Sequence, residues 1–179
     1  MSERNSLYIN VQIKKEKLEE FFRAKPHLAD MADDWKQWWD SREMYNKEAL
    51  IAIPSYQSET NRAVLDELLR DEYFGAMEQY DAENLLWTFA ALNFSENYYE
   101  ILPLLAFLKQ LAEYTEGGFS IIYDWMWGGD TVMAFVEFRQ GKASLKAVSA
   151  SSQLAPGLIE KADKNLEDFA EILAGKRAD

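Results

Sequence analysis

The chain has 179 residues, of which 48% are hydrophobic and 28% charged, and its formal net charge at pH 7 is −12. This composition is typical of a globular protein, and no apolar run approaches the roughly 20 residues that a membrane-spanning helix requires. The lack of cysteine excludes disulfides, thiol nucleophiles and thiolate metal sites, and no apolar leader is visible near the start, so we expect a cytoplasmic protein.

Four elements are predicted in the first third of the chain. Apolar side chains at alternate positions of residues 7–13 indicate a half-buried strand. Helical spacing of apolar residues indicates a helix over 14–25 and another over 26–45, which begins with a proline suited to a first helical turn. The short apolar run 49–53 ends at a proline and indicates a second strand.

The next segment, residues 58–83, is predicted to be an acidic helical insertion. Ser58 or Thr60 can cap a helix whose apolar residues recur between positions 64 and 69. Residues 71–83 are polar, acidic and interrupted by a glycine, so we expect a short helix and a loop there.

A strand and a helix are expected next. Residues 85–94 are apolar at odd and even positions alike, which is typical of a central strand covered on both faces, and a buried helix is the alternative. Ser95 can cap the following helix, whose first turn should hold Pro103 because proline lacks the amide hydrogen that a helix interior needs. Gly117 and Gly118 are expected to end this helix.

Residues 119–148 are predicted to form three antiparallel strands joined by tight turns at Gly128-Gly129 and Gln140-Gly141. Two-residue hairpin loops favour glycine because their turns require positive φ. A two-residue loop at the first turn gathers the apolar residues of both strands on one face, whereas a three-residue loop mixes them with polar ones. The residues expected on that buried face are Phe119, Ile121, Tyr123, Trp125, Val132, Val136 and Phe138.

A final amphipathic helix over 157–174 completes the chain. The predicted order is β-α-α-β-α-β-α-β-β-β-α, a single α+β domain over residues 1–179 with its core sheet and helices in 6–148. Two β-α-β units, over 7–53 and 85–127, outline a ferredoxin-like fold. We therefore expect a mostly antiparallel sheet with helices packed on one face, extended by the C-terminal meander and helix.

The negative charge is concentrated in one part of the chain. Residues 59–100 contain ten acidic and two basic residues, a balance of −8, whereas residues 1–27 have a balance of +2. An acidic protein repels nucleic-acid phosphates, so we expect no direct binding of DNA or RNA. The acidic segment either keeps the protein soluble or provides an electrostatic surface for a basic partner.

The sequence points to no catalytic or metal chemistry. His27 is the only histidine, and no nucleophile is placed beside it by any motif. Asp30 and Asp34 share a helix face, but oxygen-ligand metal sites draw on a loop or on several elements, so we interpret the pair as part of a solvated face. Phosphate-binding glycine loops and hydrolase motifs do not occur. We therefore predict no catalytic residue, no metal site and no cofactor.

Candidate binding residues fall into two groups. The first consists of tryptophans outside the main core pattern and the mixed face of the predicted meander, because such aromatic and Met residues are favoured at interfaces. The second consists of carboxylates in the acidic segment. The candidates are Trp39, Asp124, Met126, Trp127, Asp130, Met133 and Phe135 in the first group, and Asp66, Glu67, Asp71 and Glu72 in the second.

These observations predict a non-enzymatic acidic domain that binds a protein partner, and a basic one in particular, as inhibitors and immunity proteins of nucleases or toxins do. A second hypothesis is a small-molecule or enzymatic pocket between sheet and helices, walled by Trp87, Tyr123 and Trp125. A third is a self-assembling structural or virion-associated protein, joined as a homo-oligomer through a sheet edge or the 157–174 helix.

Overall fold

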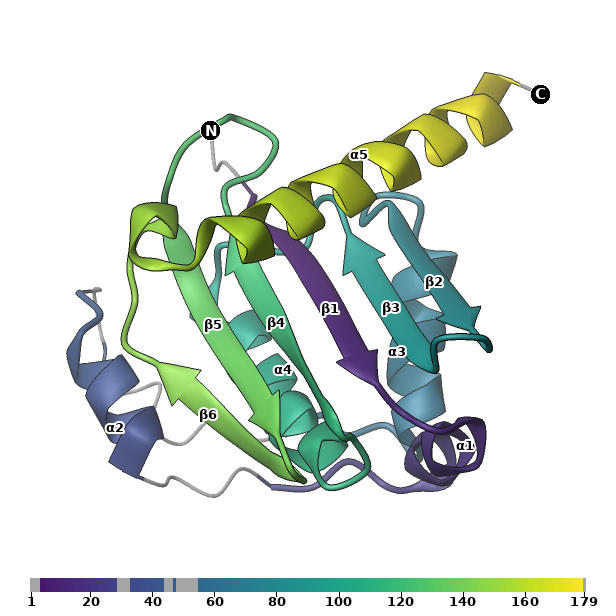
Figure 1. Cartoon of the computed structure of the whole chain (residues 1–179), viewed down its shortest axis with the longest axis horizontal. Helices are drawn as coiled ribbons and strands as arrows, with labels where there is room; N and C mark the ends of the chain where they lie inside the picture. Colours follow the sequence, from purple (N-terminus) through teal and green to yellow (C-terminus); the bar gives the residue numbers. More distant parts are fainter. Residues whose placement is uncertain (1–3, 29–32, 44–46, 48–54, 179) are drawn as a thin grey trace.

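The fold is built on one six-stranded antiparallel sheet, in a computed structural model that describes residues 4–28, 33–43, 47 and 55–178. The strand order across the sheet is β2-β3-β1-β4-β5-β6 (Figure 1), so the N-terminal strand lies inside the sheet. The strands are β1 (Ser6–Gln12), β2 (Ala76–Asp81), β3 (Leu86–Ala91), β4 (Gly117–Tyr123), β5 (Val132–Arg139) and β6 (Lys142–Lys146).

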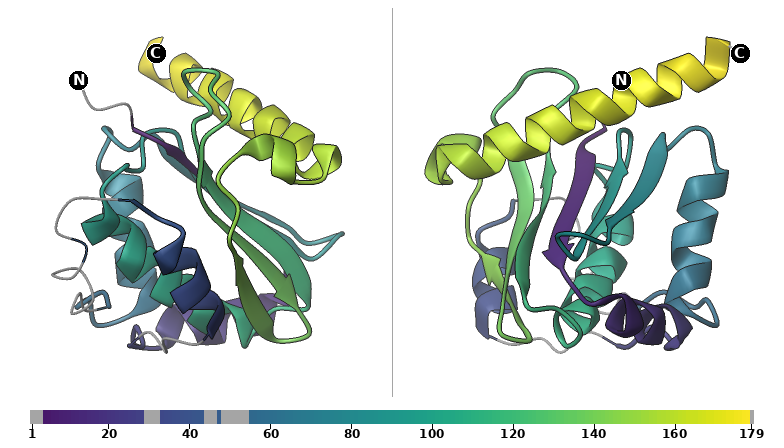
Figure 2. Two further views of the ribbon diagram at one scale, coloured as in Figure 1. Left: turned by 90° about the vertical axis from the view of Figure 1, so that its left-hand side faces the viewer. Right: turned by 45° about the vertical axis from the view of Figure 1, so that its right-hand side comes forward.

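Five α-helices in the described part of the chain cover the two faces of the sheet unequally. Four of them pack on one face, while the longest crosses the other face diagonally and leaves part of it open (Figures 1 and 2). The four helices that precede the C-terminal meander therefore share one face, as predicted, and the C-terminal helix, for which no face was predicted, lies on the other. The helices are α1 (Lys15–Arg23), α2 (Asp33–Asp40), α3 (Asn61–Arg70), α4 (Tyr98–Ala112) and α5 (Pro156–Ala178).

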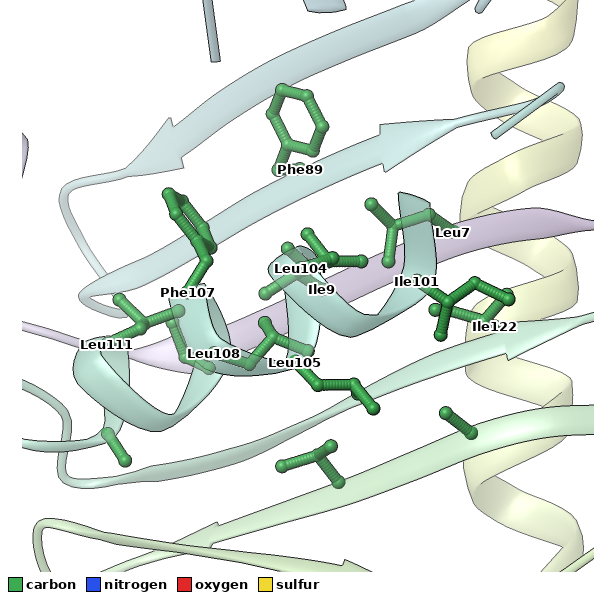
Figure 3. Close-up of a cluster of buried hydrophobic side chains, with 14 of the residues drawn as sticks. Leu7, Ile9, Phe89, Ile101, Leu104, Leu105, Phe107, Leu108, Leu111 and Ile122 are labelled. Carbon is green, nitrogen blue, oxygen red and sulfur yellow. The ribbon is translucent and has the colours of Figure 1, made fainter. Parts of the chain in front are cut away.

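The first core lies between the sheet and helices α1–α4, and α4 fills its centre. Figure 3 shows Ile101, Leu104 and Leu108 of α4 with Leu7 and Ile9 of β1, and each of these side chains is at most 1% exposed. Burial of one such aliphatic side chain stabilises a fold by about 1.5–3 kcal/mol. The amino-terminal strand and α4 therefore hold each other in place across 90 residues of sequence.

Helix α4 begins at Tyr98, two residues beyond the start that a Ser95 cap would give. Its N-cap is Asn97, whose side-chain oxygen accepts the backbone N–H of Tyr99 at 3.0 Å, while Ser95 forms the preceding turn by accepting the N–H of Asn97 at 2.9 Å. Pro103 consequently lies beyond the first turn, inside the helix. Proline removes one backbone hydrogen bond there, and the almost complete burial of α4 offsets that loss.

The second core lies under α5. The buried side chains of this helix, Ala162, Leu166 and Phe169, follow helical spacing and pack on Tyr8, Ile121 and other residues of the opposite sheet face. The predicted helix over 157–174 is confirmed in type and position, but it continues through the expected stop near Gly175 to Ala178.

Only one of the two predicted meander turns is correct. Phe138 pairs with Ala143 and Arg139 with Lys142, which leaves Gln140-Gly141 as the two-residue loop between β5 and β6. This part of the register is confirmed.

The predicted turn at Gly128-Gly129 is wrong. Strands β4 and β5 are joined by eight residues, the 124–131 loop, and their register is displaced by one residue, with a bulge beside Tyr123. Phe119 therefore lies opposite Glu137, not Phe138. Phe119, Ile121 and Tyr123 face α5, whereas Val136 and Phe138 face α4, so the residues expected on one buried face are divided between two. The apolar pattern led to the wrong register because both faces of β4 and β5 are covered, so each strand has apolar side chains on both sides.

Residues 71–83 contain a strand, β2, where a short helix and loop were expected. Residues 58–83, expected to be a helical insertion, therefore supply both α3 and the edge strand β2. Thr60, one of the two predicted caps, is the N-cap of α3. Every neighbouring strand pair is antiparallel, and the predicted strand over 49–53 lies outside the described residues. The ferredoxin-like repeat is not confirmed.

The predicted helix over 26–45 is much shorter where the structure describes it. Residues 26–28 are not helical, Leu28 is 78% exposed, and α2 covers Asp33–Asp40. Asp30 and Tyr45 lie outside the described residues. None of the helices in the described ranges is both long enough and apolar enough to cross a membrane.

Candidate functional site

A cleft of about 590 Å³ lies between the 124–131 loop and α5. One wall comes from the end of β4 and the start of the loop, through Tyr123, Asp124 and Trp125. The other wall comes from α5, through Ile159, Asp163 and Glu167, which are four residues apart and so share a helix face. The remaining wall residues are Gly128, Gly129 and Ser151.

This acidic cleft carries three carboxylates, on Asp124, Asp163 and Glu167. No basic side chain is among the described residues that line it, because Lys161 and Lys164 lie on other faces of α5. Carboxylates gathered in a concave surface focus a negative potential into it. The acidic cleft therefore attracts cations.

Hydrogen bonds hold two of the three carboxylates, those of Asp124 and Asp163. The Asp124 Oδ1 accepts the backbone N–H of Trp127 at 3.2 Å, and the Asp163 Oδ1 accepts the Tyr123 hydroxyl at 2.7 Å. Burial, and then the adjacent Asp163 charge, raise the pKa of Tyr123, so its phenol keeps its proton and acts as a donor. Gly129 allows Asp124 to approach, because a Cβ at this glycine would lie 2.2 Å from its Oδ2.

The loop that forms one wall of the acidic cleft also carries large apolar side chains that face solvent, between the lining residues Trp125 and Gly128. Trp127 is 62% exposed and Met126 is 47% exposed, in the loop that also carries the exposed Asp130. Single exposed apolar residues are common on protein surfaces, but an exposed tryptophan beside a charged cleft is a typical interface anchor.

Four of the predicted binding residues therefore come together. Asp124 lines the acidic cleft, and Met126, Trp127 and Asp130 follow it in the same loop. The structure thus keeps them as one candidate surface, although they lie in a loop rather than on the predicted strand face.

Three other candidates are structural. Trp39 is 6% exposed and packs against Trp38 and Tyr98. Phe135 is 3% exposed and lies beside Phe119 under α5. Met133 packs on the first core, and its backbone carbonyl accepts the indole N–H of Trp38 at 3.0 Å. Burial explains these side chains without a binding role.

The four acidic candidates lie elsewhere, on α3 and in the turn that precedes β2. Asp66 forms an ion pair with Arg62 at 2.8 Å, and Arg62 also contacts Glu78 of β2. Glu67, Asp71 and Glu72 are exposed. These residues belong to the β2 end of the sheet, several strands away from the 124–131 loop (Figure 1).

The three residues predicted to wall a small-molecule pocket do not come together, although Tyr123 and Trp125 both line the acidic cleft. Trp87 is buried in the core under α4, whereas Tyr123 lies in the core under α5, on the opposite face of the sheet. His27 has an exposed side chain, and its backbone N–H is held by the side-chain oxygen of Gln110 at 3.1 Å. No group of three or more carboxylate or His side chains that could hold a metal ion is found in the described part of the chain.

The α5 contribution to the acidic cleft was missed by sequence reasoning. Asp163 and Glu167 share a helix face with Ile159, which was the available signal, but their partner Tyr123 is 40 positions away. Comparison with family models, curated proteins and solved structures finds no match to this chain.

Proposed function

We propose that this protein is a non-enzymatic binding domain that holds a basic segment of a partner protein in the acidic cleft. The observation that carries the proposal is the set of three carboxylates, Asp124, Asp163 and Glu167, which has no lining base among the described residues and lies beside the exposed Trp127. A negatively charged surface by itself is explained by solubility. A concave negative surface beside exposed apolar side chains is typical of a recognition site.

A lysine or arginine side chain of the partner fits this surface chemically. Its aliphatic stem lies along Trp125 and Ile159, and its charged head reaches the carboxylates at the wall. Trp127 and Met126 then contact apolar parts of the partner outside the cleft. The net charge of −12 speeds the encounter with a basic protein, in the way that inhibitors and immunity proteins meet their targets. A cytoplasmic location belongs to the same proposal.

A direct test titrates N-acetyl-arginine amide into the isotopically labelled protein and follows its amide and indole resonances. We expect shifts at Trp125, Trp127 and Gly128, and their loss in an Asp124→Asn/Asp163→Asn variant. Both substitutions keep an acceptor oxygen for the existing hydrogen bonds. The matched control is Glu83→Gln, which removes an exposed acid from the β2–β3 turn. Equal shifts in all three proteins would show that binding is only general attraction to an acidic surface.

A second experiment addresses the partner itself. The wild-type protein and Trp127→Ala are compared as baits in a native lysate, and the association rate of any captured protein is measured against salt. The proposal expects a basic protein that the variant does not retain and whose association slows as salt rises. Light scattering on the purified protein separates this from the self-assembly hypothesis, which requires a mass that grows with concentration.

A further inference from the structure

The two edges of the sheet differ in how they are protected. At β6 the backbone N–H of Leu145 is taken up by the Asp34 carboxylate of α2 at 2.8 Å, and lysines flank the strand at positions 142 and 146. Charged side chains and a covering helix are the usual ways to block an edge. At the other end, β2 is the outermost strand, and none of the helices in the described ranges lies beside its outer edge (Figure 1).

The free groups of β2 can be assigned from its register. The carbonyl of Gly75 accepts the N–H of Leu92 at 3.2 Å, and these two residues stand one step before the pair Ala76 and Ala91. Inward and outward backbone groups alternate along an antiparallel strand. The backbone N–H and C=O groups therefore point toward β3 at Met77, Gln79 and Asp81. They point away from the sheet at Ala76, Glu78 and Tyr80. Within the described residues nothing bonds to these six groups.

The charge around this edge selects its occupant. Glu72 precedes β2, Glu78 lies within it and Asp81 ends it, in the 59–100 segment whose balance is −8. The basic groups nearby are Arg62, which is paired with Asp66 and Glu78, Lys15 over the Tyr80 ring, and Lys176 and Arg177 at the end of α5. Both α5 residues line a cleft with Asp71 and Glu72, and Arg177 donates to the Glu72 carbonyl. A second copy of the chain would bring two such acidic edges together, and like charges opposed across strands are destabilising.

We propose that the outer edge of β2 binds an extended segment of a basic protein by strand addition. The added strand hydrogen-bonds to the six free backbone groups. Because these bonds involve only the main chain, they supply affinity without sequence preference. This surface is separate from the acidic cleft, and the inference does not depend on the function proposed for that cleft.

The two faces of β2 define the pattern of the bound segment. Glu78 faces α3, where it and Asp66 share the single guanidinium of Arg62. Two carboxylates against one cation leave an excess negative charge, so basic side chains are favoured on that side. Met77 faces the α5 side, and Leu173 of α5 lies beside the start of β2, so apolar side chains are favoured near these two residues. The cleft of about 380 Å³ at that end of β2 also has charged walls, from Asp71, Glu72, Lys176 and Arg177. Successive residues of a strand alternate between faces. The expected ligand therefore alternates basic and apolar residues.

The test uses an acetylated, amidated peptide of alternating lysine and valine, about seven residues long to match the six-residue β2. Hydrogen exchange of the full-length protein is measured by NMR with and without saturating peptide. We expect the amides of Ala76, Glu78 and Tyr80 to exchange at least about tenfold more slowly with peptide, while those of Met77 and Gln79 change little. Unchanged exchange at the three outward amides would overturn the proposal.

Three comparisons make the result specific. Ala76→Pro removes one outward donor without removing a bond to β3, and we expect it to weaken the peptide about tenfold. In Trp127→Ala the slower exchange of the three outward β2 amides persists with peptide, because this substitution alters only the 124–131 loop beside the acidic cleft. A peptide of alternating glutamate and valine should not bind, and equal binding of it would contradict the proposal. Protection of the outward amides without peptide, together with a dimer mass in sedimentation, would instead assign the edge to a second copy.

Discussion

The carboxylate of Asp34 joins three elements, because its Oδ2 accepts the backbone N–H of Leu145 in β6 at 2.8 Å. Its other oxygen accepts the N–H of Trp35 at 2.9 Å and contacts the Lys109 ammonium of α4 at 3.3 Å. The side chain is only 30% exposed. The sequence interpretation of Asp34 as part of a solvated face is therefore wrong, and the residue attaches α2 to the edge of the sheet.

Removal of this carboxylate should destabilise the protein. In Asp34→Ala the Leu145 N–H loses its acceptor and the Lys109 ammonium loses one of its contacts, and an unmade buried hydrogen bond costs about 1–3 kcal/mol. We expect urea denaturation to show a loss of that order. Asp33→Ala is the matched control, because Asp33 lies in the same first turn of α2 but is exposed. An equal loss in both variants would assign the effect to the helix terminus instead.

The same carboxylate should make stability depend on acid pH. Burial alone would raise the pKa of Asp34, but the Leu145 N–H, the Lys109 charge and the Trp35 N–H outweigh burial and hold it below its usual value. A lowered folded-state pKa adds stability above the unfolded pKa of about 3.9, and this stability is lost as pH falls through the folded value. The free energy of unfolding should therefore fall below about pH 4, and Asp34→Asn should flatten that decline. A parallel decline in both proteins would contradict the assignment.

Gly118 marks a close approach between β4 and β1. Its φ is +130°, and a Cβ added there would lie 2.2 Å from the backbone oxygen of Asn10. Neither backbone can move without disturbing the centre of the sheet, so Gly118→Ala should cost more than about 2 kcal/mol. Gly117→Ala is the control, because the nearest atom to its added Cβ is 3.7 Å away and its φ is ordinary. Thermal unfolding of the two variants checks the prediction, and similar melting temperatures would disprove it.

Local patterns identified the elements that depend on local chemistry. The strand over residues 7–13, the Thr60 cap of α3 and the Gln140-Gly141 turn each involve residues close in sequence, and the structure confirms them as elements. The expectation that this strand is half-buried is wrong, because β1 lies inside the sheet and both of its faces are covered. The face of α5 followed from its helical spacing for the same reason.

Tertiary contacts decided the rest. β2 has the composition of a loop, and it is a strand because Arg62 of α3 pairs with Glu78 and Tyr80 donates to the Ile13 carbonyl at 3.0 Å. The β4–β5 register could not be predicted, because each strand has apolar residues on both faces and the choice between them depends on α5. In the candidate site, exposure of Trp127 was expected, but the Asp163 contribution required knowing where α5 crosses the sheet.

Two tyrosines under α5 provide a last test of this second core. The Tyr8 hydroxyl is buried and has no hydrogen-bond partner among the described residues, whereas the Tyr123 hydroxyl donates to Asp163. Burying an unpaired hydroxyl is unfavourable, so Tyr8→Phe should leave stability unchanged or raise it by up to about 1 kcal/mol. Tyr123→Phe should lower it by about 1–2 kcal/mol, since it removes a hydrogen bond to a charged group and leaves Asp163 without its donor. Urea denaturation measures both, and hydrogen exchange in α5 should accelerate only in Tyr123→Phe. Destabilisation by Tyr8→Phe to the same extent would show that the Tyr8 hydroxyl has a partner after all.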